Sequence, residues 1–145
     1  MNSEPTASKA SLGATPMAHL KTNSGSYDIE ADIQRIGADF LVCIYGGEIP
    51  HIGAVAAAHP RPSLKDPAEM SATASVICYT AHKEDDLAKQ AAETLAAALN
   101  TRVVVTAGIH WDNLSQTGID QIVANCRHLV ARILEKAQSM VDRSP

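Results

Sequence analysis

Three histidines, His51, His82 and His110, stand beside predicted turns at the ends of apolar segments. Glu48 precedes the first of them, and Asp112 follows the last. Imidazole nitrogens and carboxylate oxygens suit a divalent or ferric metal ion, and two or three protein ligands leave coordination positions for a cofactor or water. A single histidine at a strand end is usually only a surface hydrogen-bonding group. The metal site predicted at His51, His82 and His110 therefore depends on a fold that brings them together.

The chain offers few cations for an anionic ligand. Arg61 lies between two prolines, and an arginine can grip a phosphate through two parallel hydrogen bonds. Ser63 in the same rigid segment can add a hydroxyl, and Lys83 is the other charged candidate. The glycines form neither a GxGxxG nor a P-loop pattern, and there is no GxSxG sequence. The common nucleotide-binding loops and a serine-hydrolase nucleophile are therefore unsupported.

Length and composition indicate one domain. A chain of 145 residues can build one hydrophobic core but hardly two. Residues 1–26 are rich in small and polar types, so we expect a flexible leader there and a single folded domain over residues 27–145. The leader lacks a basic start followed by an apolar block, which argues against a secretory signal.

Charge and cysteine usage exclude several classes of partner. The net charge of -4 and the 3% aromatic content give neither a basic surface nor a stacking surface for nucleic acid. No apolar run approaches the roughly twenty residues of a membrane span. Three cysteines without metal-type spacing sit in apolar segments, which predicts buried free thiols in a reducing compartment. We therefore expect a cytoplasmic protein that binds neither nucleic acid nor membrane.

Hydrophobic periodicity predicts the element order β-β-β-β-α-β-α. Alternating residues over 27–34 predict a half-exposed strand, and 52–58 is a mostly alanine strand against which a helix, a ligand or a second subunit must pack. Three prolines make 59–67 an extended loop. The fold class is α/β, an α+β sandwich in which a mixed sheet of five or more strands packs against helices. The remaining strands are predicted at 40–45, 73–79 and 102–109, and the helices at 84–99 and, from a Thr117 capping box, 117–141.

Strand order decides whether the histidines meet. If the first four strands form an antiparallel meander, His51 at the start of the third and His82 after the fourth lie at one edge of the sheet. The helix between the fourth and fifth strands makes these two parallel, which places His110 beside His82. A crossover after Pro60 would instead make the fourth strand parallel to the third, and His59 would then replace His51. Both arrangements keep His82 and His110 together.

Five separated motifs, in the same order along the chain, resemble the small prenylated-flavin chaperone family that accompanies UbiD-type decarboxylases, including those that act on phenolic acids. The resemblance covers nearly all of the predicted folded part. The motifs are GGEIPHIGAV at 46–55, PRPSL at 60–64, ASVI at 74–77, HKED at 82–85 and AGIHWDN at 107–113, where Ile49 and Trp111 are not part of the patterns.

The resemblance implies a proteasome-assembly-chaperone-like fold and a homodimer that binds prenylated FMN. It also implies delivery to, or maintenance of, a UbiD-type decarboxylase, with a flavin prenyltransferase as a further partner. Glu48 departs from the pattern, in which we expect aspartate. The positions that match the family motifs, and so become candidate cofactor-binding residues, are His51, Arg61, Ser63, His82, Lys83, His110, Asp112 and Asn113.

We therefore expect a non-catalytic carrier that holds the phosphate of prenylated FMN directly or through a divalent or ferric metal ion. Two alternatives remain open. A small metal-dependent lyase or hydrolase would use the same histidines, with Asp112 or Glu48 as general base. A structural subunit would dock its alanine-rich strand onto a larger decarboxylase and would retain no cofactor.

Overall fold

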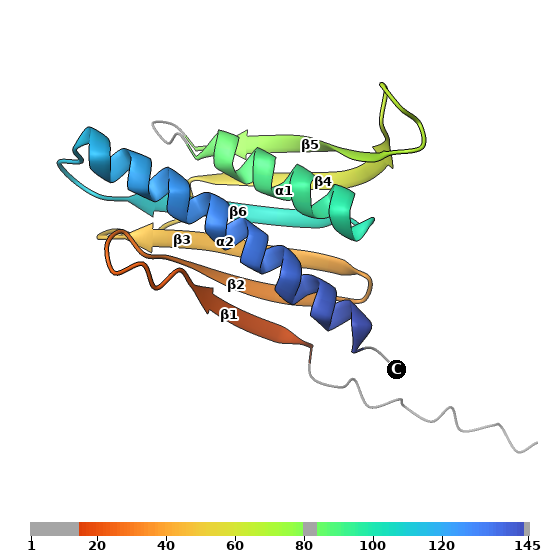
Figure 1. Ribbon diagram of the computed structural model, residues 1–145, viewed down its shortest axis with the longest axis horizontal. Coiled ribbons are helices and arrows are strands. Elements are labelled where there is room, and N and C mark those ends of the chain that lie inside the picture. The colour runs from red at the N-terminus through yellow and green to blue at the C-terminus, as the bar shows by residue number, and fades with distance from the viewer. Residues whose placement is uncertain (1–14, 80–83, 144–145) are drawn as a thin grey trace, which may run out of the picture.

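The computed structural model describes residues 15–79 and 84–143, which form a mixed sheet with two helices on one face (Figure 1). The predicted fold class, a mixed sheet of five or more strands packed against helices, is confirmed. Neither helix combines the length and apolar character required to cross a membrane. The elements are β1 (Met17–Lys21), β2 (Ile29–Ile36), β3 (Asp39–Gly47), β4 (Ala54–Pro62), β5 (Met70–Cys78), α1 (Asp85–Leu99), β6 (Val103–His110) and α2 (Gln116–Asp142).

The strand order within the described sheet is β1-β2-β3-β6-β4-β5. The β3–β6 pair is parallel and the other pairs are antiparallel. The β5, α1 and β6 elements form a crossover unit in which β4 lies between the two parallel strands. As a result, the last residues of β3, β5 and β6 and the first residues of β4 lie at the same end of the sheet, on the left in Figure 1.

The predicted meander gives the correct direction of each strand but the wrong neighbouring strands. We expected the third predicted strand beside the second, whereas β6 separates β3 from β4. The residues of β6 that face the helices, including Val103 and Val105, are fully buried, and its neighbours are the apolar β3 and the alanine-rich β4. In this position both edges of β6 are paired, and its helix-facing valines lie among the apolar residues of β3 and β4. Periodicity within one strand contains no information about this choice.

The strand expected at 52–58 begins later and runs on to Pro62, so the first part of the predicted proline-rich loop is strand. β4 pairs with β6 only from Ala54 to Ala58, and beyond this point its only described neighbour is β5. Prolines are accepted where a strand lacks a neighbour on one side, because a missing N–H then breaks no ladder bond on that side. The rule against proline in central strands therefore does not apply to the second half of β4.

The flexible leader expected over 1–26 is too long at its end. β1 (Met17–Lys21) pairs with β2 over its whole length, so the sheet begins ten residues before the expected domain boundary at 27. Its alternation is weak because β1 is a short edge strand, in which only Ala18 and Leu20 pack against the core. Residues 1–14 lie outside the described part of the chain.

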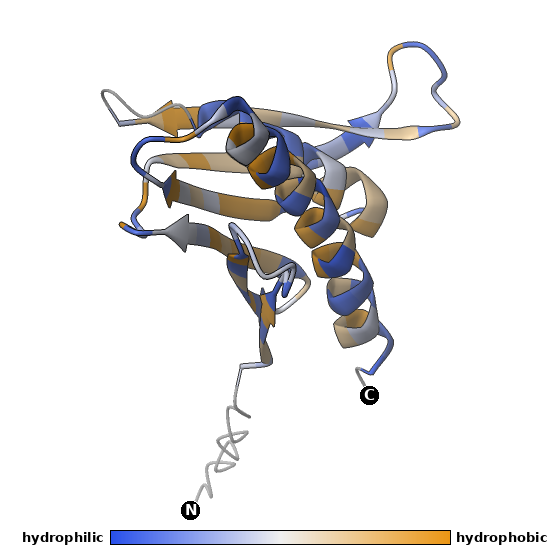
Figure 2. Ribbon diagram, turned by 60° about the vertical axis from the view of Figure 1, so that its left-hand side comes forward, coloured by the Kyte–Doolittle hydropathy of each residue, from blue (hydrophilic) through white to orange (hydrophobic). Residues whose placement is uncertain are grey.

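Alanines allow α1 to pack closely on the sheet. Ala54, Ala56 and Ala58 of β4 point toward α1, where the facing residues are also small. Of the three neighbours that the alanine-rich strand allowed, a helix, a ligand or a second subunit, the structure has a helix, α1. Figure 2 shows that both helices lie on one side of the sheet, so within residues 15–79 and 84–143 no helix lies on the opposite face. The buried residues of α1 are Ala88, Ala91, Ala92, Leu95 and Ala96.

The ends of both helices have local explanations. Asn100 ends α1 in the left-handed conformation, where its N–H bonds to Ala96 O, as expected from the sequence. α2 begins one residue before the predicted Thr117, and the side chain of Ser115 caps it by accepting a hydrogen bond from Gly118 N. The N-cap therefore lies two residues before the predicted Thr117, and it forms no capping box because the third helical residue is Gly118, which has no side chain.

Candidate functional site

The two principal motifs pack backbone against backbone at the end of the sheet. We call this end, residues 46–53 with 107–112, the histidine rim. Glu48 N donates to His110 O over 2.8 Å, and Gly53 N donates to Ala107 O over 2.9 Å. A Cβ atom at Gly108 would lie 1.7 Å from His51 O. Only glycine fits there, and the two segments therefore fix each other.

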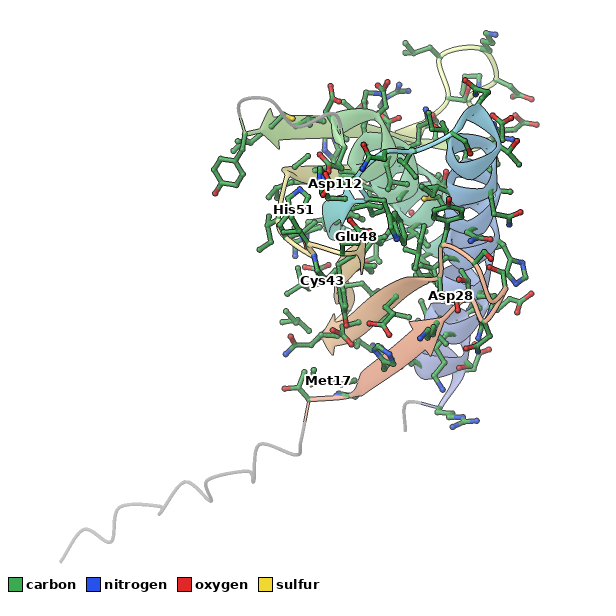
Figure 3. All side chains as sticks on the ribbon, turned by 90° about the vertical axis from the view of Figure 1, so that its left-hand side faces the viewer. Met17, Asp28, Cys43, Glu48, His51 and Asp112 are labelled. Carbon is green, nitrogen blue, oxygen red and sulfur yellow. The ribbon has the colours of Figure 1, made fainter. Side chains whose placement is uncertain are left out.

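Glycine is required a second time, at Gly47. Its φ of +92° is unfavourable for other residues, and an added Cβ would lie 1.9 Å from His110 O. Figure 3 looks onto this part of the rim, where Glu48, His51 and Asp112 lie near one another. The convergence of His51 and His110 at one end of the sheet thus follows from strand direction and from these close backbone contacts.

His51 is held by both of its ring nitrogens. Nδ1 lies 2.9 Å from Ile49 O, and Nε2 lies 3.1 Å from Glu84 Oε1. A carbonyl can only accept, so Nδ1 is placed to donate to Ile49 O, and Nε2 faces the Glu84 carboxylate. Ile109 N also donates to Glu84 Oε1, over 3.3 Å. His51 and Glu84 therefore link the start of α1 to β4 and β6, and His51 could bind a metal through Nε2 only after leaving Glu84.

Gly53 makes room for the His51–Glu84 contact. A Cβ atom at Gly53 would lie 2.6 Å from Glu84 Oε2 and 3.1 Å from His51 Nε2. The side chains of His51 and Glu84 are 19% and 13% exposed, so water screens this pair only partly. The sequence motif HIG at 51–53 thus places a histidine and the space for its carboxylate partner together.

His110 belongs to a second, more exposed group. Its Nε2 lies 2.9 Å from Asp112 Oδ1, and the two side chains are 46% and 64% exposed. Asp112 N donates to Glu48 Oε2 over 3.2 Å. This group is accessible to a ligand without rearrangement of the core. It is also acidic, because two carboxylates accompany one imidazole.

The structure separates the predicted phosphate contacts from the histidine rim. Arg61 and Ser63 lie at the far end of β4, roughly 25 Å away at about 3.3 Å per residue. Arg61 Nε donates to Thr73 Oγ1 over 2.6 Å, while Ser63 Oγ accepts from Lys65 N over 3.2 Å within the turn. Within one chain, these two residues cannot contact the same phosphate as His51.

The remaining candidates have different outcomes. Asn113 follows the rim residues and adopts a positive φ of 54°, in the loop before α2. His82 and Lys83 lie outside the described residues. Over residues 15–79 and 84–143, no three His, Cys, Asp or Glu side chains converge in a way that would hold a metal ion. The described donors His110, Asp112 and Glu48 have suitable chemistry but are bonded to one another and to the backbone.

A pocket of about 470 Å³ opens beside His110, between the start of α1 and the first three turns of α2. Its wall includes Trp111, whose ring meets the edge of Tyr27 at a centroid distance of 5.3 Å and an angle of 83°. Burial raises the pKa of the Cys126 thiol to about 12, so this side chain is no thiolate nucleophile. The lining residues are mostly apolar: Glu84, Leu87, Ile109, His110, Trp111, Leu114, Ile119, Ile122, Val123 and Cys126.

Tyr27, Trp111 and Asn125 were not among the candidates predicted from the sequence. Asn125 is 4% exposed and donates through Nδ2 to Tyr27 O over 2.7 Å and to Ser26 O over 3.1 Å. It holds Tyr27 in a left-handed conformation with a φ of 55°. Trp111 could have been found as the single tryptophan of the chain beside a motif histidine. The other two have no comparable signal, because their contact joins residues nearly one hundred positions apart.

The helix-free face of the sheet is apolar along its four strands at the β5 edge. Residues in register form two rows across these strands, of which the first is Cys43, Thr106, Val55 and Ile77. Ile77 is 70% exposed. Cys78 is also exposed and Cys43 half-buried, so the expectation of three buried thiols is correct only for Cys126. The second row is Leu41, Val104, Ala57 and Ser75.

Two sequence comparisons relate this chain to a chaperone family. The family model described as prenylated flavin chaperone LpdD-like domain matches residues 23–138. Protein LpdD of Lactiplantibacillus plantarum is 28% identical over 112 residues, which are 71% of this chain and 72% of that protein. A solved structure described as a novel chaperone complex for yeast 20S proteasome assembly has a TM-score of 0.48 and 15% identity, with 88% of this chain and 95% of that chain covered.

Proposed function

Because this chain belongs to the family defined by the prenylated flavin chaperone LpdD-like domain, we propose that it is a non-catalytic carrier of prenylated FMN for a UbiD-type decarboxylase. Family membership supports the chaperone role in a UbiD-type system. The observation that supports a cofactor site is the position of His110, which lies both in the histidine rim and in the wall of the adjoining 470 Å³ pocket. Ligand pockets commonly have volumes of roughly 300–1,000 Å³.

The electrostatics of the rim favour a cation between protein and phosphate. Glu48, Glu84 and Asp112 place carboxylates beside the two described rim histidines. The phosphate of a flavin mononucleotide is also anionic, so it would be repelled unless positive charge separates it from these groups. We therefore include a bound divalent or ferric metal ion in the proposal, held by His110 and Asp112 and by His51 once it leaves Glu84. Such an ion would bind the phosphate oxygens and anchor the cofactor.

The decisive experiment is co-expression of the chain with a flavin prenyltransferase, followed by desalting, an absorption spectrum and metal analysis. Wild-type protein is expected to retain flavin and metal in equal amounts. His110→Ala removes an exposed side chain and should lose most of the bound flavin while the fold stays intact. His59→Ala is the matched control, since His59 is exposed at the other end of β4. Retention of flavin by His110→Ala at the wild-type level would refute the site assignment.

A homodimer through the helix-free face completes the proposal. Six strands of about eight residues, spaced by about 4.8 Å, present roughly 600–800 Å², and a stable interface buries about 800 Å² per partner. The exposed Ile77 lies within the apolar part of this face. Ile77→Asp should therefore yield monomers in light scattering. Leu64→Asp, at a residue 88% exposed in the β4–β5 turn, should remain dimeric; dimers of both variants would place the interface elsewhere.

The same face favours a second candidate function, a structural subunit that docks onto the decarboxylase itself. An apolar sheet face that no helix covers is the observation behind it. This candidate predicts a stable complex with the decarboxylase, loss of that complex in Ile77→Asp, and no flavin in the wild-type protein. The carrier instead retains flavin in the absence of the decarboxylase.

A further inference from the structure

We infer that the fused ring system of the flavin enters the pocket between α1 and α2, with Trp111 as the aromatic wall that determines which ligands fit. This inference rests on the proposed function and deepens it, because the family match specifies neither Trp111 nor the seam between the helices. The rim histidines would then hold the phosphate end, and the pocket would hold the ring end, of one ligand.

The lining of the pocket suits a flat apolar ring. Glu84 and His110 are its only ionisable groups apart from the Cys126 thiol among the described residues, and both belong to the rim side. On α2, Ile119 and Val123 are 42% and 43% exposed although they lie at the pocket, where a buried helix face would be expected to continue. Exposed aliphatic side chains gathered at a hollow of this size indicate an apolar ligand.

Trp111 is supported by Tyr27, which is itself supported by α2. Its ring rests on the edge of Tyr27, and Asn125 of α2 fixes the backbone on which Tyr27 sits. Tyr27 is further confined by α2, since a Cβ atom at Gly118 would lie 2.8 Å from Tyr27 Oη. An aromatic wall that is ordered in advance loses little conformational entropy on binding, which favours affinity.

Trp111 also separates two hollows. Besides the pocket between the helices, it lines a second hollow of about 290 Å³ on the other side, beside Tyr45 and Gly47. That second hollow is lined by Lys21, Asp28, Glu30 and Glu48 and is much more polar than the pocket between the helices. A fused aromatic ring therefore belongs on the helix side of Trp111. The polar hollow remains accessible to the hydrophilic part of a ligand.

The test uses the fact that Trp111 is the single tryptophan of the chain. Prenylated FMN, loaded by co-expression with a flavin prenyltransferase, should quench its fluorescence, and free FMN should do so in titrations. The Trp111 variants have no tryptophan, so their affinity is followed through the fluorescence of FMN itself. Trp111→Ala should weaken FMN binding on the order of tenfold, as expected for loss of one stacking contact. Trp111→Phe, which keeps a flat ring against Tyr27, should retain most of the affinity.

Pocket-blocking variants determine which side of Trp111 the ring occupies. Val123→Phe fills the pocket from a half-exposed position, whereas Val141→Phe adds the same group to α2 at a 36% exposed residue far from the pocket. Val123→Phe should lose flavin and quenching, and Val141→Phe should match the wild type. If both variants retain flavin equally, the ring lies elsewhere and the inference is wrong while the carrier function stands. If wild-type protein retains no flavin, the proposed function itself fails.

Discussion

Gly108→Ala tests directly whether the two motif segments pack as described. The added Cβ would lie 1.7 Å from His51 O and 2.3 Å from its carbonyl carbon, both backbone atoms that no rotamer change can move away. Ordinary contact requires about 3.4 Å, so the His51 peptide must shift by 3.4 minus 1.7, or about 1.7 Å. A shift of this size breaks the Gly53 N to Ala107 O hydrogen bond.

The expected cost follows from these two effects. Overpacking in a tight site costs about 1–3 kcal/mol, and the lost hydrogen bond about 1 kcal/mol. The free energy of unfolding should therefore fall by about 2–4 kcal/mol. At roughly 3 °C per kcal/mol for a chain of this length, the midpoint of thermal unfolding should drop by about 6–12 °C.

Urea and thermal unfolding followed by circular dichroism measure this change. Gly25→Ala is a comparison variant that reports backbone strain without a clash, because Gly25 has a φ of +90° and no atom within 4 Å of an added Cβ. Strain of this kind costs on the order of 1–3 kcal/mol. Gly108 has no positive φ, so Gly108→Ala reports the clash alone. A Gly108→Ala protein that unfolds within about 1 kcal/mol of the wild type would refute the close packing of the rim and the positioning of His51 that depends on it.

Two further predictions concern residues that support the site. Asn125→Ala removes the donor to Tyr27 O and one of the two donors to Ser26 O, which also accepts from Ser24 Oγ. Two lost hydrogen bonds, at about 0.5–1.5 kcal/mol each, should lower the free energy of unfolding by about 1–3 kcal/mol. The fluorescence maximum of Trp111 should shift to the red as Tyr27 loosens, and an unchanged spectrum would contradict the proposed link from α2 to Trp111. The hydrogen bond from His19 lowers the pKa of Asp32 below its ordinary value of 3.8 in the folded protein. The stabilisation that this hydrogen bond gives to the fold is therefore complete above pH 3.8, and it disappears as the pH falls through the lowered pKa of the folded state. Since both side chains are about half exposed, His19→Ala should cost less than about 1 kcal/mol at pH 7, and the difference from wild type should vanish in urea titrations near pH 2; a difference that persists there would contradict the assignment.

The helices and most strands could be predicted from the sequence because their signals are local. Asn100 ended a run of helical periodicity, and the acidic first turn marked the start of α1. The long apolar run at 40–45 and the valine run at 103–105 became the adjacent centre of the sheet. β1 was missed because a short edge strand buries too few side chains to show a clear alternation.

The sequence predicted the positions of candidate residues where position depends on strand direction, and not where it depends on distance along a strand. His51 and His110 were expected at one end of the sheet, and alternating strand directions place them there whichever strands are neighbours. Arg61 and Ser63 were grouped with them only by motif, and an extended β4 carries them to the opposite end. The prolines at 60 and 62 led us to predict a loop where β4 continues as a strand. A proline is excluded from a strand only where a neighbouring strand would need an N–H donor at that position.

The amino-acid sequence by itself determined the alternation of strands and helices, the glycines at the rim, and the small side chains that let α1 approach the sheet. Each of these depends on a residue and its near neighbours. Only the tertiary structure decided that β6 lies between β3 and β4, that Glu84 reaches His51, and that Asn125 orders Tyr27 against Trp111. Such contacts join residues far apart in the chain, and their energies arise only when the whole core packs at once.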